Sequence, residues 1–298
     1  MNQPLVSVIL PTYNRSHLIG ESVKSVVDQT YKNWELIIVD DGSSDETSVL
    51  FTNHPDSRIQ YYRIDHCGII GRVRNHGMQH AKGEYIAFLD SDDLWREDKL
   101  EFQFALLNTH PEVYFITSNG VHFGDDHSLP AELENLFVGN AFLPMLEEER
   151  FIFFVPSLLF EKKVVNEIGY IDELMISGGD IDFYFRMARR FNGIFTNERL
   201  VKIRKHQSHS PALETVAYLD YIGMVTQFFN EKSLTRKQYS GILSKQYYRL
   251  GLVFLRKGLF NDSFNNFLKY NFLKPVNYKG WIRLVQSLCL ASFAKLKG

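Results

Sequence analysis

An apolar run that stops abruptly at a group of carboxylates constrains the fold of this 298-residue chain more than any other feature. Residues 85–89 read Tyr-Ile-Ala-Phe-Leu, and Asp90, Asp92 and Asp93 follow at once. A short apolar run of this kind predicts a buried strand. The carboxyl ends of parallel strands form the edge at which open α/β sheets bind their ligands. An Asp-x-Asp sequence at that edge supplies the oxygen ligands that Mg²⁺ and Mn²⁺ prefer.

Helix capping is the competing interpretation of the same residues. A helix is expected to start near Trp95, and Asp92 or Asp93 just before it would accept hydrogen bonds from its first backbone N–H groups. The stretch 83–95 taken alone leaves both interpretations open.

Strands and helices alternate through the first part of the chain. The strands are expected at 6–10, 35–39, 59–63, 85–89 and 113–118. Helices are expected between them at 18–29, in a short segment ending near 51, at 71–81 and at 96–108. Strands that alternate with helices of this length predict an α/β fold with a mainly parallel, doubly wound sheet.

The carboxyl ends of three predicted strands carry polar groups. They read Pro-Thr-Tyr-Asn-Arg at 11–15, Asp-Asp-Gly-Ser at 40–43 and Asp-Ser-Asp-Asp at 90–93. In a parallel sheet these ends share one edge, so we expect them to line one cleft. Capping explains any one of these termini more easily than it explains the convergence of all three.

The cleft suits a nucleotide diphosphate. Tyr13 is placed to stack on a base, and Asp40 or Asp41 to accept a hydrogen bond from a ring N–H. Asp90 and Asp92 are placed to hold a metal ion on the diphosphate. The sequence contains neither Gly-x-Gly-x-x-Gly nor Gly-x-x-x-x-Gly-Lys-Ser/Thr, so metal and side chains rather than a glycine loop are expected to hold the phosphates.

Charge divides the chain into two parts. Residues 232–298 contain 13 Lys and Arg against one acid, Asp262, whereas residues 1–231 contain 20 basic and 34 acidic residues. An acidic body with a basic, aromatic-rich tail predicts two parts with different partners. We expect a cytoplasmic protein, because the sequence shows no secretory signal or membrane span and its two cysteines, Cys67 and Cys289, lack metal or redox spacing.

Six segments together resemble family 2 of the glycosyltransferases, which have the GT-A nucleotide-sugar-binding fold. They are residues 6–15, 39–45, 74–77, 83–93, 168–173 and 179–186, which occur in the order and rough spacing of that family. The resemblance covers about residues 5–210. It implies a catalytic domain over 1–210, with a nucleotide-binding half at 1–120 and an acceptor half at 121–210, followed by a basic, aromatic-rich helical appendage at 211–298.

The resemblance implies an inverting transfer of a sugar from a nucleotide-diphosphate donor, a UDP-sugar, to a hydroxyl. The acceptor would be a glycan or a lipid-linked glycan in cell-surface polysaccharide synthesis. The donor-binding residues are expected to be Pro11, Thr12, Tyr13, Asn14, Asp40, Asp41, Arg74, Asp90 and Ser91. The metal, Mn²⁺ or Mg²⁺, is expected on Asp90, Asp92 and His206.

Asp180 is the expected catalytic base, again by resemblance. A first-turn or capping acid of the helix predicted at 180–191 is the alternative for Asp180, and an ordinary surface histidine is the alternative for His206. The chain departs from the family at Gly179, where a Glu is usual. That departure is the one sequence feature in favour of a second function, a non-catalytic nucleotide-sugar-binding scaffold subunit of a glycan assembly complex.

The basic tail predicts contact with an anionic membrane surface through 232–298. Trp281, Ile282, Leu284, Val285, Leu288 and Phe293 would form an apolar helix face, edged by Lys279, Arg283, Lys295 and Lys297. A solvated helical hairpin that balances the acidic body is the alternative. No nucleic-acid-binding module accompanies the basic residues, so no nucleic acid is expected as a partner. The expected location is the cytoplasm, peripheral to the inner face of the membrane.

Overall fold

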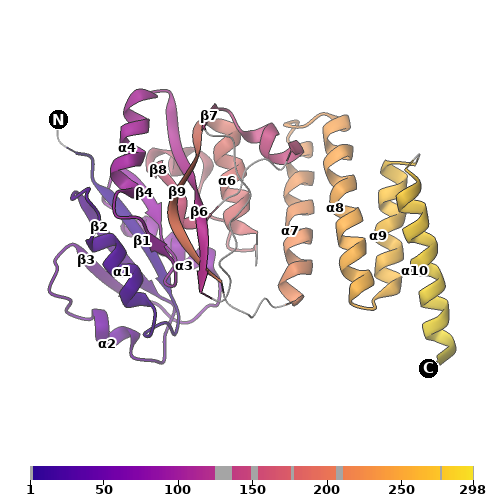
Figure 1. Cartoon of the computed structure of the whole chain (residues 1–298), viewed down its shortest axis with the longest axis horizontal. Helices are drawn as coiled ribbons and strands as arrows, with labels where there is room; N and C mark the ends of the chain where they lie inside the picture. Colours follow the sequence, from indigo (N-terminus) through magenta and orange to yellow (C-terminus); the bar gives the residue numbers. More distant parts are fainter. Residues whose placement is uncertain are drawn as a thin grey trace. The chain divides into compact units, whose positions relative to one another are not determined.

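The computed structural model describes residues 3–124, 136–148, 154–175, 178–205, 211–275 and 277–297, which form two compact units (Figure 1). The first unit comprises Met1–Met175 and Gly179–Ser208, and it contains the sheet. The second comprises Ile176–Gly178 and His209–Gly298, and it is helical.

In the first unit, strands and helices alternate as the sequence predicts. The strands are β1 Val6–Thr12, β2 Trp34–Asp40, β3 Ile59–Arg63, β4 Tyr85–Phe88, β5 Leu94–Trp95, β6 Val113–Gly124, β7 Leu136–Gly139, β8 Leu159–Glu161 and β9 Asn192–Lys205. The helices are α1 Ile19–Val27, α2 Thr47–Phe51, α3 Ile70–His80, α4 Lys99–Thr109, α5 Lys163–Ile168 and α6 Gly179–Arg190. A π-helical turn at Pro144–Glu148 and a 3₁₀ turn at Val155–Ser157 precede β8.

One sheet joins all these strands in the order β3-β2-β1-β4-β8-β6-β9-β5, with β7 also paired to β9. The strands β3, β2, β1 and β4 are parallel, and so are β6 and β9. β8 runs antiparallel between β4 and β6, and β5 and β7 run antiparallel to β9. The predicted α/β class is confirmed, with parallel pairing where helices connect the strands. β8 follows a 3₁₀ turn instead of a crossover helix, which is why the alternation pattern gives no direction for it.

The register of the parallel strands brings their polar ends together. Every residue of β1 and of β2 is buried, which the apolar runs predict. Thr12 at the end of β1 pairs with Asp40 at the end of β2, and Ile9 pairs with Phe88 at the end of β4. The residues that follow these three strands therefore lie at one edge of the sheet.

The helix after the acidic run begins later than the sequence indicates. Trp95 belongs to β5, and α4 starts at Lys99 with Asp98 at its N-cap position. Neither Asp92 nor Asp93 caps this helix, so the capping interpretation of the acidic run is wrong. A two-residue strand paired with β9 separates the run from the helix, and such a short strand leaves almost no sequence signal.

The second unit is a row of helices in which each contacts the next along the chain (Figure 1). They are α7 Pro211–Asn230, α8 Arg236–Arg256, α9 Phe260–Leu273 and α10 Tyr278–Lys297. A Thr235–Gln238 capping box starts α8, and Gly258 at φ +72° closes the turn after it. Gly251 lies against the ring of Phe267, so α8 and α9 approach closely. Among the described residues, no helix combines the length and the apolar character needed to cross a membrane.

Candidate active site

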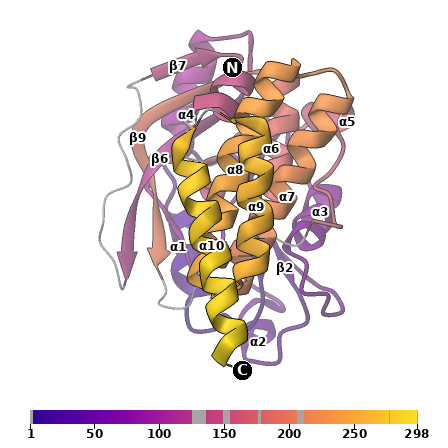
Figure 2. The same ribbon diagram turned by 90° about the vertical axis from the view of Figure 1, so that its right-hand side faces the viewer.

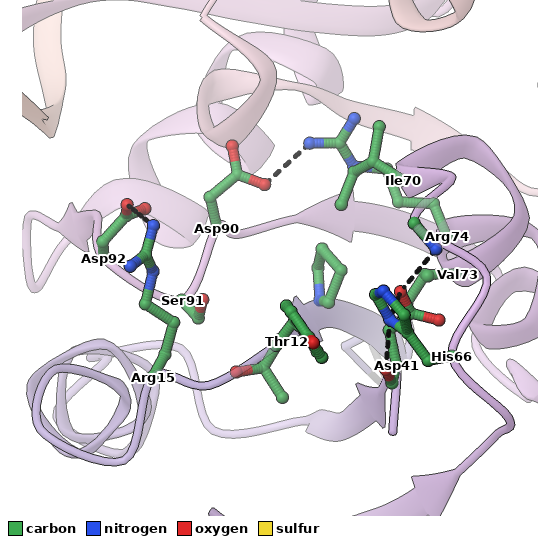
Figure 3. Close-up of a pocket in the computed structure, with 13 residues that line it drawn as sticks. Thr12, Arg15, Asp41, His66, Ile70, Val73, Arg74, Asp90, Ser91 and Asp92 are labelled. Atoms are coloured by element: carbon green, nitrogen blue, oxygen red, sulfur yellow. Dashed lines mark hydrogen bonds and ion pairs between the residues drawn. The ribbon is translucent and has the colours of Figure 1, made fainter. Parts of the chain in front are cut away.

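The ends of β1, β2 and β4 line a pocket of ≈ 440 Å³, within the range of about 300–1,000 Å³ that small-molecule sites occupy (Figure 3). Its lining residues are Pro11, Thr12, Tyr13, Arg15, Asp41, His66, Gly68, Ile70, Val73, Arg74, Asp90, Ser91 and Asp92. Eight of the residues expected to bind donor or metal are among them. Asn14 and Asp40 do not line the pocket, Asp180 lies beside it, and His206 falls outside the described residues.

Asp40 and Asn14 do not face the pocket; their side chains bond to the turn that follows β2. Asp40 is fully buried; it accepts a hydrogen bond from the backbone N–H of Ser43 at 2.8 Å and another from the Tyr61 hydroxyl. Asn14 adopts a left-handed backbone conformation at φ 51°, and its Oδ1 accepts from the backbone N–H of Ser44 at 2.8 Å. Both side chains therefore fix the turn after β2.

Asp41 faces the pocket and is held by the loop after β3. The backbone N–H groups of Cys67 and Gly68 donate to its two carboxylate oxygens at 2.8 and 2.9 Å. Burial acts to raise the pKa of Asp41, but these hydrogen bonds and the nearby imidazole of His66 outweigh it and lower the pKa below its ordinary value. Asp41 is thus an ionised acceptor at neutral pH.

Tyr13 stacks on His66, with ring centroids 4.2 Å apart and planes inclined by 15°. His66 Nδ1 lies 2.9 Å from the Asp41 carboxylate, which orients the imidazole (Figure 3). The Tyr13 ring, expected to stack on a base, is 43% exposed in this arrangement. The pair forms an aromatic wall at the Asp41 side of the pocket.

The two carboxylates expected to bind metal lie on the opposite side of the pocket, together with Ser91. The Asp90 side chain is 30% exposed, and its Oδ1 accepts from Arg74 Nη2 at 2.7 Å. The Asp92 side chain is 20% exposed, and its Oδ2 lies 3.9 Å from Arg15 Nη2 (Figure 3). Two accessible carboxylates facing one pocket fit a hard divalent cation. Among the described residues, no group of three or more His, Cys, Asp or Glu side chains is gathered as a metal site.

Asp93, the third acid of the run, is structural. It is buried, and its Oδ1 accepts from the backbone N–H of Arg204 on β9 at 2.8 Å. Burial, together with the charges of Asp90 and Asp92, raises the pKa of Asp93 to about 8. It joins the acidic run to β9 and does not line the pocket.

Arg74 connects the carboxylates on two sides of the site. Its side chain is 4% exposed; besides Asp90 it has Asp180 Oδ2 at 3.8 Å from Nη1. Burial alone would lower the pKa of Arg74, but attraction to Asp90 and Asp180 raises it above the ordinary value. The guanidinium therefore keeps its charge although it is buried.

Two buried polar atoms of the pocket have no hydrogen-bond partner among the described residues. They are Oγ1 of Thr12 and Nε of Arg74, and both residues line the pocket. Buried polar groups are nearly always satisfied, by protein, water or a ligand. Two residues that line the pocket therefore each hold a polar atom that the described residues leave unsatisfied.

Asp180 lies in the first turn of α6, where its Oδ1 accepts from the backbone N–H of Ile181 at 2.8 Å. Its side chain is 29% exposed. The preceding Gly179 is buried, and a Cβ there would lie 3.0 Å from Ile171 Cγ2 and 3.1 Å from the Asp172 carbonyl oxygen. Close packing of α6 on residues 171–172 accounts for glycine at the position where the family has Glu.

In the motif at residues 74–77, Arg74 lines the pocket, whereas Asn75 and Gly77 hold α3 in place. The Asn75 side chain donates to the Ile171 carbonyl at 2.9 Å and accepts from the Ile171 N–H at 3.0 Å. Gly77 lies directly on the side chain of Ile9, where any Cβ would collide. The glycine therefore lets α3 lie flat on β1, and Asn75 ties α3 to the segment on which α6 packs.

Sequence reasoning missed His66, Gly68, Ile70 and Val73 as pocket residues, and it left Arg15 unassigned. A usable signal existed. Arg63 at the end of β3 pairs with Asp40, so the loop after β3 reaches the same edge as the other three strand ends. His66 keeps the exposure of a loop residue, with 49% of its side chain accessible, while its Nδ1 lies 2.9 Å from the Asp41 carboxylate in the pocket wall.

Comparisons with known proteins identify the family and agree with the fold. The family model described as Glycosyl transferase family 2 matches residues 7–169. An uncharacterised glycosyltransferase of Rickettsia typhi is 31% identical over 246 residues, which are 79% of this chain and 74% of that protein. The UDP-Glc:alpha-D-GlcNAc-diphosphoundecaprenol beta-1,3-glucosyltransferase WfgD of Escherichia coli is 44% identical over 107 residues, 36% of this chain and 42% of that enzyme. The structure of the mannosyltransferase PcManGT from Pyrobaculum calidifontis with GDP-Man and Mn²⁺ aligns at a TM-score of 0.63 and 17% identity, over 99% of this chain and 88% of that one.

Proposed function

The chain belongs to glycosyltransferase family 2 and has a fold of the GT-A type, and we propose that it transfers a sugar from a UDP-sugar to a hydroxyl of a lipid-linked glycan with inversion at the anomeric carbon. The partial match to the Escherichia coli glucosyltransferase, which is named for a UDP-Glc donor and an undecaprenol-linked acceptor, supports the donor and acceptor classes. Such a reaction belongs to cell-surface polysaccharide synthesis. It would take place at the inner face of the membrane, where lipid-linked acceptors are held.

The observation that carries the donor assignment is the convergence of three features on one pocket: the stacked aromatic pair, the ionised Asp41 and two accessible carboxylates. That pocket has a volume of ≈ 440 Å³, and Thr12 and Arg74, each with one buried polar atom that lacks a partner among the described residues, also line it. The ionised Asp41 would accept from a ring or ribose donor, and Tyr13 or His66 would stack on the base. Asp90 and Asp92 would hold Mn²⁺ or Mg²⁺, which neutralises the leaving diphosphate when bound.

Asp180 would act as the base. It would take the proton of the acceptor hydroxyl as the oxygen forms its bond to the anomeric carbon and the bond from that carbon to the diphosphate breaks. Arg74 lies between the two acids, with Nη1 3.8 Å from Asp180 Oδ2 and Nη2 2.7 Å from Asp90 Oδ1, so it links the proposed base to the proposed metal-binding carboxylate. The products are the extended glycan and UDP, with the proton on Asp180.

Donor binding and transfer, measured separately, test this proposal. UDP-, GDP- and dTDP-sugars would be titrated against the protein with Mn²⁺ and with EDTA, and transfer to an undecaprenol-diphosphate glycan followed by mass spectrometry. Asp180→Asn should lower transfer by about 10²–10⁴-fold and leave the donor Kd unchanged. Asp28→Asn is the matched control, because Asp28 is an exposed acid at the C-cap of α1 that pairs with Lys24. Near-normal transfer by Asp180→Asn would remove Asp180 from this role.

A scaffold subunit that binds nucleotide sugars without turning them over is the second proposal we considered. Its sequence support was Gly179, and the packing of Gly179 on Ile171 offers a structural reason for that residue that leaves Asp180 in place. The same titrations distinguish the two. Metal-dependent donor binding with neither hydrolysis nor transfer, even with acceptor lipid present, would favour the scaffold.

A further inference from the structure

The last helix, α10, has an exposed apolar face. The side chains that form it are 46–67% exposed: Tyr278, Trp281, Ile282, Val285 and Leu288. At about 100° per residue these five positions fall within about 120° of the helix circumference, so they form one stripe. Figure 2 looks towards α10 in front of α9.

The stripe lies away from the face by which α10 packs. Gly280 is buried directly against Tyr270 of α9. Ser287 is fully buried, and its Oγ lies 2.8 Å from the Oγ of Ser263 on α9. Gly280 and Ser287 both fall roughly opposite the centre of the stripe on the helical wheel. Packing within the second unit therefore leaves the stripe exposed, and exposed apolar stripes of this size mark interaction surfaces.

Charge indicates the kind of partner. Residues 232–298 contain 13 Lys and Arg against one acid, and Lys279 and Arg283 follow Ile282 around the circumference of α10. A second copy of this stripe would bring like charges together, which disfavours symmetric pairing. An anionic lipid surface satisfies both features, since it takes apolar side chains at the headgroup boundary and basic side chains on its phosphates.

We propose that α10 lies on an anionic lipid surface, with the stripe from Tyr278 to Leu288 inserted at the headgroup boundary and the neighbouring basic residues on lipid phosphates. The proposed contact is peripheral, with the helix lying along the lipid surface. This adds a binding surface to the membrane location proposed above. Vesicle binding needs neither donor nor acceptor, so its failure and the failure of the proposed reaction are separately observable.

Flotation of the full chain with vesicles tests the proposal. Phosphatidylcholine vesicles containing phosphatidylglycerol would be compared with vesicles of phosphatidylcholine alone. Val285→Asp should lower the fraction bound by about tenfold or more, the factor expected for withdrawing one buried valine from an apolar phase. Leu219→Asp is the matched control, because Leu219 is similarly exposed, at 52% against 58% for Val285, on α7 of the same unit. Circular dichroism would verify that both variants keep their helices.

The expected result is flotation that requires phosphatidylglycerol, weakens with salt, survives Leu219→Asp and is lost in Val285→Asp. Equal flotation of the wild type and Val285→Asp would overturn the proposal, and so would absence of the wild type from the floating fraction. Concentration-dependent dimers that Val285→Asp dissolves would assign the stripe to a second copy of the chain, and that outcome also overturns it.

Discussion

The ion pair between Arg74 and Asp90 is asymmetric in burial, which predicts which partner the fold can lose. The Arg74 side chain is 4% exposed and that of Asp90 is 30% exposed. Removing one member of a buried pair costs about 3–5 kcal/mol, because the other charge stays buried. Asp90→Ala leaves the guanidinium with Asp180 at 3.8 Å, so we expect it to lower the free energy of unfolding by about 2–3 kcal/mol. Arg74→Met leaves a carboxylate that water reaches, so its cost should stay below about 1 kcal/mol.

Urea unfolding followed by tryptophan fluorescence measures both costs. Trp34 and Trp95 lie in the first unit and Trp281 in the second, so a Trp281→Phe background reports on the unit that contains the pair. The double variant Arg74→Met/Asp90→Ala should recover to within about 1 kcal/mol of the wild type, because it has neither the buried charge nor its partner. The reasoning would be refuted if Arg74→Met lowered the free energy of unfolding as much as Asp90→Ala does. It would also be refuted if the loss in the double variant equalled the sum of the two single losses.

Three further outcomes follow from the structure. Gly77→Ala should lower the free energy of unfolding by about 1–3 kcal/mol, because its Cβ would press on Ile9, whereas Gly20→Ala, which has open space in α1, should be neutral or stabilising; thermal melts compare the two. Burial acts to raise the pKa of Asp45, but hydrogen bonds from two neighbouring residues lower it, so Asp45 stabilises the fold above the ordinary carboxyl pKa and loses this effect as pH falls through the lowered one. Asp45→Asn should therefore be less stable than the wild type at pH 7, and the difference should shrink in urea melts below about pH 4. His66→Ala should weaken donor binding by about tenfold in calorimetry, because it removes part of the aromatic wall. An unchanged Kd would mean that the nucleobase of the donor does not stack on this wall.

The edge of the sheet and most of the pocket were predictable because strand polarity and register follow from short-range patterns. Once 6–10, 35–39 and 85–89 are recognised as parallel strands, their polar ends have to meet. The structure shows this meeting in the register of β1 and β2, where Thr12 pairs with Asp40. The pattern indicates which segments converge; it does not indicate which of their side chains face inward.

The choice between Asp40 and Asp41 shows this limit. Consecutive residues of a strand point to opposite sides, so an uncertainty of one residue at a strand end exchanges the buried and the exposed side chain. Asp40 is the last residue of β2 and points to Tyr61, whereas Asp41 turns into the pocket. Asn14, which is expected to bind the donor, has a left-handed backbone that depends on the tertiary fit with Ser43 and Ser44.

The resemblance to a known family assigned Arg74 to the donor but gave no role to Asn75 or Gly77, whose roles come from packing. Gly77 sets the depth of α3 on the sheet through its contact with Ile9. At that depth Arg74 reaches the Asp90 carboxylate, 16 positions along the chain. Asn75, the next residue of α3, holds Ile171 by two hydrogen bonds.

This arrangement makes α3 the element that fixes Asp180 relative to the pocket carboxylates. Ile171, once held by Asn75, supports the start of α6 at Gly179, and the next residue of α6 is Asp180. The position of the proposed base is thus set through one helix that also carries Arg74, the cation between the two carboxylates. A site of this kind keeps its geometry even though its parts are separated by almost a hundred residues of sequence, because Asn75 and Ile171 lie 96 positions apart and bond directly.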